Sequence, residues 1–141
     1  MTSKPDQQAI ALLRENRLRA TGGRVAVLAT LLEAGRPLTR QQIADRLGGQ
    51  APDKATIYRA LQRLVDSDLV HRAFVQQRQW YFEPAHRCGA TQCHPHFTCV
   101  QCRRTDCLHD VAAALVTLPD GMTLLRQQIR IEGICASCCD N

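Results

Sequence analysis

The first 87 residues of this 141-residue chain contain no cysteine, although eight cysteines follow. Aromatic residues make up only 4%, so a small apolar core needs further support, and a structural metal provides it. No apolar run approaches the roughly 18 residues of a membrane span, and the polar start lacks the apolar region of a secretory signal. We therefore expect a cytoplasmic protein without membrane association, whose cysteines are metal ligands rather than disulfides.

The net charge of +5 is confined to one half of the chain. Residues 1–83 carry the whole excess, because residues 84–141 hold equal numbers of acidic and basic side chains. A modest excess alone is weak evidence for a polyanionic partner. Together with the cysteine distribution, it predicts two domains, at 1–83 and 96–141, joined by a connection at 84–95.

The cysteine-free half predicts four helices followed by a β-hairpin. Thr39 and Asp53 are typical N-caps for the third and fourth helices. Two β-prone runs, at residues 69–75 and 79–83, flank a polar turn. In the fourth helix, four apolar residues follow the i, i+3, i+4, i+7 spacing of a buried stripe: Ile57, Ala60, Leu61 and Leu64.

The opposite face of the fourth helix bears donors and one aromatic ring but no carboxylate: Lys54, Tyr58, Arg59, Gln62 and Arg63. Helices followed by a hairpin is the order of a winged helix-turn-helix, whose reading helix enters the major groove of DNA. The alternative is a helical bundle whose last helix has a solvated face. The short third helix, the tight turn and the hairpin favour DNA binding.

The cysteine-rich half predicts a small α/β domain, which makes the whole chain α+β. Strand-like segments lie at residues 97–100 and 124–134, and the alanine-rich segment 109–118 predicts a helix between them. Two C-x2-C pairs, Cys99/Cys102 and Cys135/Cys138, are separated by 32 residues. Four thiolates satisfy tetrahedral zinc with no open position, so the pairs predict a structural zinc site. Cys139 is an alternative to Cys138.

A second group of candidate ligands surrounds the first pair. His94 and His96 lie two residues apart, so on an extended segment both imidazoles face the same side. Further candidates are His71 and Glu83 on the predicted hairpin, and the thiols of Cys93 and Cys107. A mixed site that draws on both halves has the properties of an exchangeable, regulatory site.

These residues resemble the Fur family of metal-responsive transcription regulators, in the family's order and over almost the whole chain. The matching pieces are 18–24 (LRATGGR), 55–61 (ATIYRAL), 69–71 (LVH), 81–83 (YFE), 94–102 (HPHFTCVQC) and 135–138 (CASC). The resemblance implies a winged-helix domain followed by a dimerisation domain. It also implies a homodimer that represses transcription by binding a palindromic DNA operator when loaded with metal.

The resemblance also implies roles for single residues. Tyr58 and Arg59 fall at base-contacting positions, and Arg19 falls at a basic minor-groove position. The four paired cysteines fall on the structural zinc site, and Glu83, His94 and His96 on an interdomain sensing site. His71 matches a ligand position of some zinc-sensing members.

Departures from the family pattern bear on the sensed metal. Pro37 stands where iron and peroxide sensors have a ligand histidine, and Cys107 replaces a common acidic residue. Pro95 replaces an acidic residue between the two histidines, which argues against a second regulatory site. Nearby thiols favour zinc over Fe²⁺ or Mn²⁺, so a zinc uptake repressor is favoured, with iron, manganese, nickel and peroxide sensing as alternatives.

Two other classes of protein compete with a regulator. A zinc enzyme needs an open metal position and usually a general base, but neither H-E-x-x-H nor the deaminase pattern is present, and we expect no enzyme. A thiol redox switch is the second alternative, with four unassigned cysteines: Cys88, Cys93, Cys107 and Cys139. It requires exposed thiols of low pKa.

Overall fold

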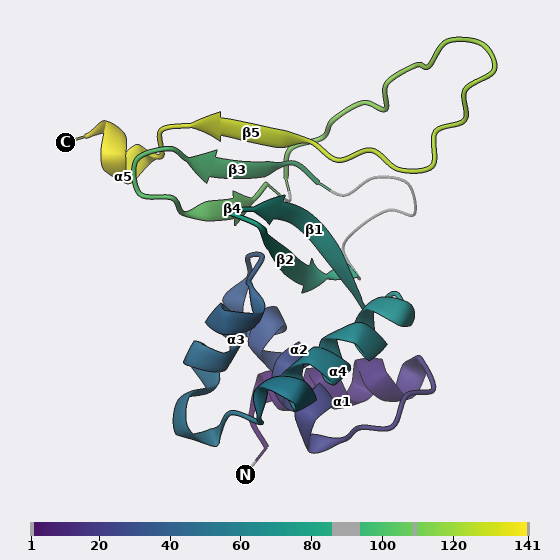
Figure 1. Cartoon of the computed structure of the whole chain (residues 1–141), viewed down its shortest axis with the longest axis vertical. Coiled ribbons are helices and arrows are strands. Elements are labelled where there is room, and N and C mark those ends of the chain that lie inside the picture. Colours follow the sequence, from purple (N-terminus) through teal and green to yellow (C-terminus); the bar gives the residue numbers. More distant parts are fainter. Residues whose placement is uncertain (1, 86–93, 109, 141) are drawn as a thin grey trace. The chain divides into compact units, whose positions relative to one another are not determined.

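The computed structural model describes residues 2–85, 94–108 and 110–140. Its backbone contacts divide the chain into two compact units, Met1–His86 and Arg87–Asn141. Each unit has its own sheet: a two-stranded sheet in the first and a three-stranded sheet in the second. Figure 1 labels the elements of both units.

Side-chain caps begin every α-helix of the first unit. Helix α1 (Lys4–Glu15) starts with a capping box between Ser3 and Asp6, and Thr21 caps α2 (Gly22–Ala34). Helix α2 ends at Gly35, whose φ of 62° is the left-handed conformation that glycine adopts without strain. Gly22 and Gly23 form the start of α2.

The next two helices confirm the caps expected from the sequence. Thr39 caps α3 (Arg40–Leu47) through a capping box with Gln42. After the 3-10 turn η1 (Gly48–Gln50), Asp53 caps α4 (Lys54–Asp66) by accepting a 2.6 Å hydrogen bond from the Thr56 N–H. That bond to the Thr56 backbone holds the pKa of Asp53 below its usual value, because it favours the ionised form of the carboxyl group.

A hairpin completes the first unit. Strands β1 (Val70–Gln76) and β2 (Gln79–Pro84) pair antiparallel with a bulge between Arg72 and Phe74. The two turn residues, Gln77 and Arg78, have positive φ values of 50° and 62°, as a type I′ hairpin turn requires. Leu38 bridges Phe82 on β2 through a pair of backbone hydrogen bonds, which ties the segment before α3 to the hairpin.

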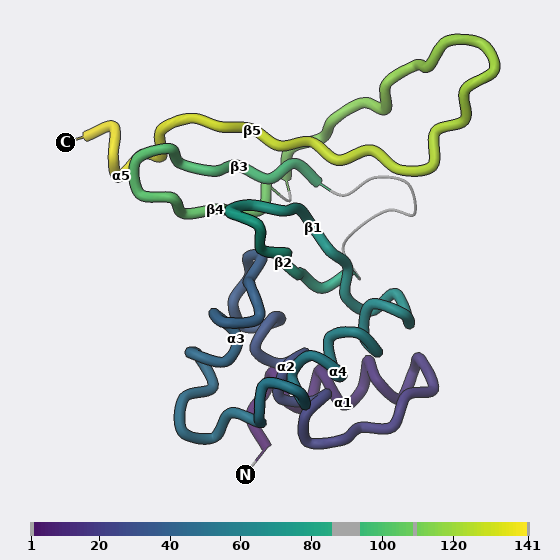
Figure 2. Tube along the Cα trace, in the orientation of Figure 1, coloured from purple at the N-terminus to yellow at the C-terminus, as the bar shows by residue number. Residues whose placement is uncertain are grey.

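One apolar core holds the helices and the hairpin together. Leu13 of α1, Leu28 of α2, Ile43 of α3 and Leu64 of α4 are all fully buried within it. The stripe predicted on α4 is confirmed, because all four of its apolar residues are buried. Figure 2 follows this chain path from α1 to the hairpin. This unit is a winged helix-turn-helix, in which α4 follows α3 and the hairpin forms the wing.

The second unit is built on a small mixed sheet. Strand β3 (His96–Cys99) lies in the middle, antiparallel to β4 (Thr105–Cys107) and parallel to β5 (Arg130–Gly133). The hydroxyl groups of Thr98 and Thr105 hydrogen-bond across β3 and β4 at 2.9 Å, both buried. A four-residue helix, α5 (Ala136–Cys139), follows β5. Helix and sheet together confirm the α+β class.

The helix predicted at residues 109–118 is wrong for the part that the structure describes, because residues 110–118 contain no helix. Val111, Leu115 and Val116 are 47%, 46% and 62% exposed. A helix this short needs a surface on which to bury its apolar face. The backbone instead bonds to the Gln127 side chain, which accepts from the Val116 N–H at 2.7 Å and donates to the Ala114 carbonyl at 3.0 Å.

The long strand predicted at residues 124–134 is also shorter in the structure, where β5 covers only Arg130–Gly133. The residues before it belong to the extended connection from β4, which Figure 2 shows projecting from the sheet. Strand β4 and helix α5 were not predicted from the sequence. Among the described residues, no helix has the length and apolar character needed to cross a membrane.

Candidate nucleic-acid face and metal centres

Helix α4 presents two rows of polar side chains to the solvent. Lys54, Tyr58 and Gln62 form one row at intervals of four residues, and Arg59 and Arg63 form the next. Tyr58 is 52% exposed, so its ring and hydroxyl are accessible to a partner. Arg59 bonds to the Thr56 hydroxyl at 3.3 Å and leaves the rest of its guanidinium available for a further contact.

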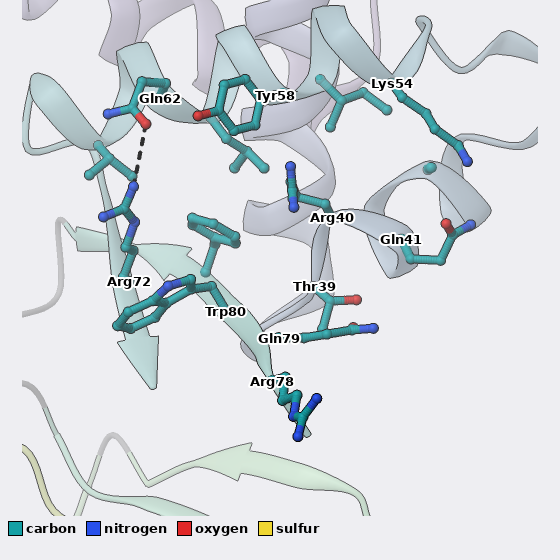
Figure 3. A pocket seen from close by; sticks show the side chains of 15 residues that line it. Thr39, Arg40, Gln41, Lys54, Tyr58, Gln62, Arg72, Arg78, Gln79 and Trp80 are labelled. Carbon is teal, nitrogen blue, oxygen red and sulfur yellow. Dashed lines mark hydrogen bonds between the residues drawn. The ribbon is translucent and has the colours of Figure 1, made fainter. Parts of the chain in front are cut away.

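The first of these rows lines a groove of about 510 Å³ between α4, the start of α3 and the wing. Figure 3 shows the side chains that line it. Four of them are cationic and none is a carboxylate: Arg40, Lys54, Arg72 and Arg78. A concave surface lined by one sign of charge attracts a polyanion, so the groove extends the DNA-facing character of α4 onto the wing.

Two cation–π contacts order the side chains at this groove. The Arg40 guanidinium lies 5.2 Å from the centre of the Tyr58 ring, and that of Arg72 lies 5.6 Å from the Trp80 ring. Arg72 also donates a 3.3 Å hydrogen bond to the Gln62 side chain, drawn as a dashed line in Figure 3. Residues from α3 and β1 therefore position Tyr58 and Gln62, two of the three polar side chains that α4 turns toward the groove.

The DNA-contact residues expected from the sequence lie at different places on the first unit. Tyr58 lines the groove, whereas Arg59 and Arg63 lie on α4 beside it. Arg19 is exposed in the connection from α1 to α2, where its carbonyl accepts a 3.0 Å hydrogen bond from Arg24. Four lining residues were missed: Arg40, Arg72, Arg78 and Trp80. Of these four, only Arg78 could have been found from the sequence, because a basic residue in a predicted hairpin turn indicates a DNA contact.

Four cysteines from both C-x2-C pairs converge in the second unit. The sulfur atoms of Cys99, Cys102, Cys135 and Cys138 all lie within 4.8 Å of one another. Tetrahedral zinc with Zn–S bonds of about 2.3 Å separates its sulfur ligands by about 3.8 Å, and the Cys102 and Cys135 sulfurs are 3.8 Å apart. The group contains Cys138 rather than Cys139. The donors therefore fit a structural zinc ion with no open position.

Local backbone geometry prepares this group for metal. Hydrogen bonds from the backbone of Cys102 and then of Cys135 lower the pKa of the Cys99 thiol to about 6. The Cys135 N–H lies 3.4 Å from the Cys99 sulfur. A hydrogen bond to the Cys135 sulfur raises the pKa of Cys138 to about 12, so the metal-free group keeps a proton that zinc binding releases. Arg103, with φ of 64°, closes the turn after the first pair.

A histidine and a carboxylate face each other on the wing. His71 of β1 is the cross-strand partner of Glu83 of β2, and their Nε2 and Oε1 atoms are 2.5 Å apart. The side chains are only 12% and 4% exposed. They occupy the hairpin face opposite to Phe82, which belongs to the core. The first unit therefore holds one nitrogen and one oxygen donor close together.

Two histidines and a thiol come together in the second unit. The ligand atoms of His94, His96 and Cys107 lie within 4.8 Å of one another. The histidine ring centres are 5.9 Å apart, and His96 is the cross-strand partner of Cys107. Cys88 and Cys93 lie outside the described residues. Cys107 therefore accompanies the two histidines.

These features agree with the comparison to known proteins. The ferric uptake regulator family matches residues 15–115 of this chain, which span α2 to the hairpin of the first unit and the start of the second unit. The chain belongs to this family of metal-responsive transcription regulators. The resemblance inferred from the sequence is thereby confirmed.

Solved structures of the family share the fold at low identity. A zinc uptake regulator complexed with zinc and DNA has a TM-score of 0.65 at 22% identity, over 98% of this chain and 97% of that chain. The Vibrio cholerae ferric uptake regulator gives 0.63 at 18%, over 89% and 98%. The Pseudomonas aeruginosa ferric uptake regulator with manganese gives 0.59 at 21%, over 91% and 98%. Their metals differ, so the shared fold does not identify the metal of this chain.

Proposed function

We propose that this chain is a zinc-responsive transcriptional repressor that binds a palindromic DNA operator as a homodimer. The observation that carries the proposal is the pairing of a cationic winged-helix face with two separate groups of metal ligands in one chain of this family. The four-cysteine group supports a permanent structural zinc. The histidine-containing residues support an exchangeable metal that regulates DNA binding.

The DNA side of the proposal is supported by the exposed rows of α4 and by the wing. Arg59 and Arg63 would enter the major groove with Tyr58. Arg78 at the tip of the wing and Arg19 before α2 would contact the backbone or the minor groove. None of these arginines lies in an ion pair in the part of the chain that the structure describes. Their charge is therefore available to phosphates.

The regulatory side of the proposal draws on both units. His71 and Glu83 of the first unit and His94 and His96 of the second would hold the metal together. Imidazole and carboxylate donors suit zinc, iron and manganese alike, and a thiol shifts the preference toward zinc. A metal that joins the two units restricts their relative orientation. The two DNA-binding heads of a dimer fit successive half-sites, about 34 Å apart, in only some orientations. Metal binding would therefore favour DNA binding.

A homodimer is supported by apolar side chains on the connection between β4 and β5. Val116, Met122 and Leu125 are 62%, 64% and 81% exposed. Exposed apolar residues gathered on one segment indicate a protein–protein contact. In a dimer of this family, a second copy would cover them.

The test is operator binding, measured by fluorescence anisotropy at buffered free Zn²⁺, Fe²⁺ and Mn²⁺. We expect zinc to promote binding at the lowest free concentration. The double variant His94→Ala/His96→Ala should lose metal-dependent binding while it keeps the structural zinc, the fold and the dimer. A double variant that still binds the operator in proportion to free zinc overturns the assignment of the regulatory site. Activation by iron or manganese at lower concentrations overturns the zinc preference alone.

A further inference from the structure

We infer that His94, His96 and Cys107 form a three-ligand metal half-site within the second unit, and that the Cys107 thiolate sets its preference for zinc over manganese. This inference rests on the proposed function, because it specifies the chemistry of the regulatory site. It adds a sulfur ligand and makes that ligand the determinant of metal choice.

The hydrogen-bonded sheet holds two of the three ligands in place, and the third, His94, lies two residues before β3. His96 lies on the central strand β3, where its N–H donates to the Ile129 carbonyl at 3.0 Å, and its cross-strand partner on β4 is Cys107. Beyond that pair, the Leu108 N–H donates to the Pro95 carbonyl at 2.8 Å. Backbone bonds on both sides of the site therefore fix the two strand ends from which His96 and Cys107 project.

The burial of the three ligand side chains favours metal binding. His96 is only 3% exposed, while His94 and Cys107 are partly buried. A ligand set held by a sheet and shielded from water loses little conformational freedom when it binds an ion. The three ligand atoms within 4.8 Å of one another need only small side-chain rotations to reach tetrahedral spacing.

The neighbouring carboxylate does not replace the thiol. Asp106 precedes Cys107 on β4 and is opposite Phe97 rather than His96. Alternate residues of a strand project to opposite faces, and the Asp106 carboxylate is bound by Arg104 at 2.9 Å. Strand β4 thus offers the histidines a sulfur and not an oxygen.

The donor chemistry then determines the metal. Two imidazole nitrogens and one thiolate suit zinc and cobalt, whereas manganese prefers oxygen ligands. On binding, the Cys107 S–H releases its proton to solvent and its sulfur donates an electron pair to the metal. No oxidant or reductant takes part. A carboxylate at this position would give a harder ligand set that discriminates less between zinc and manganese.

Cobalt serves as the spectroscopic probe, because a thiolate bound to Co²⁺ produces a charge-transfer band in the near ultraviolet. The full chain, with one zinc in the four-cysteine site, receives one equivalent of Co²⁺ under anaerobic, reducing conditions. Mass spectrometry verifies that the zinc stays bound. We expect the band in the wild-type protein and in Cys139→Ser, an exposed cysteine outside the group, and its loss in Cys107→Ser.

The second variant is Cys107→Asp, which keeps a ligand but replaces sulfur by oxygen. Oxygen ligands suit manganese and sulfur ligands suit zinc, so this replacement should lower the ratio of Zn²⁺ to Mn²⁺ affinity, on the order of tenfold or more. A band that persists in Cys107→Ser overturns the inference, as does an unchanged affinity ratio in Cys107→Asp. If the wild type shows the band but no metal-dependent operator binding, the proposed function fails and the ligand assignment stands.

Discussion

The contact between Arg40 and Tyr58 makes a quantitative prediction about DNA recognition. Replacing Arg40 with Gln keeps most of the side-chain length but removes the cation that lies 5.2 Å from the ring centre. A cation–π contact at an exposed site contributes about 0.5–1 kcal/mol, and Tyr58 is 52% exposed. If the contact positions the ring for DNA, its loss should weaken operator binding roughly two- to fivefold, since 1.4 kcal/mol corresponds to about tenfold.

A double-mutant cycle separates this positioning role from a direct phosphate contact of Arg40. Operator affinities are measured by anisotropy for Arg40→Gln, Tyr58→Leu and the double variant. The positioning role predicts a coupling energy of about 0.5–1 kcal/mol. Additive effects, with a reduced salt dependence in Arg40→Gln, would refute it and leave only a phosphate contact. Arg46→Gln is the matched control, because Arg46 is exposed on the same helix and does not line the groove.

Other changes test the zinc site and the reading helix. Cys99→Ser should abolish the structural zinc and unfold the second unit or prevent dimerisation, detected by metal analysis, circular dichroism and light scattering. The control Cys139→Ser should retain the zinc, the fold and the dimer. Equal damage in the two variants would contradict the ligand assignment. Arg59→Ala should cost about 1–3 kcal/mol in operator discrimination, and an unchanged affinity would show that α4 is not the reading helix. Arg19→Ala should weaken binding similarly for all sequences and lower the salt slope by about one.

The winged helix was predictable because its signals are local. Thr39 and Asp53 cap the helices that the sequence indicates, and the apolar stripe of α4 faces the core. The turn at Gln77 and Arg78 also lies where polarity between two β-prone runs indicates it. Each of these features depends on residues within a few positions of one another, so periodicity and capping rules are sufficient.

The second unit was less predictable because its order depends on distant partners. Residues 110–118 have the apolar repeats of a helix, but Val111, Leu115 and Val116 stay largely exposed in the structure. Strand β5 is parallel to β3 across a long connection, and its pairing partner is not apparent from its own sequence. The secondary structure of such segments depends on tertiary contacts rather than on local sequence patterns.

For the functional residues too, features set by local spacing were predictable, and features set by contacts between distant segments were not. The spacing of the two C-x2-C pairs predicted a four-cysteine group, and only the choice between Cys138 and Cys139 required the structure. The groove residue Arg40 was missed because its relation to Tyr58 joins two helices through space. The neighbour of His96 on β4, Cys107, is defined by strand register, which the sequence did not reveal because β4 itself was not predicted.

The central claim is that metal binding and DNA binding are coupled in this chain, and thermodynamic linkage tests it most directly. Zinc affinity of the regulatory site is measured by competition with a chelator, with and without saturating operator DNA, on protein that already carries the structural zinc. The account predicts that DNA tightens zinc binding by the same factor by which zinc tightens DNA binding. A zinc affinity that is unchanged by operator DNA would contradict it.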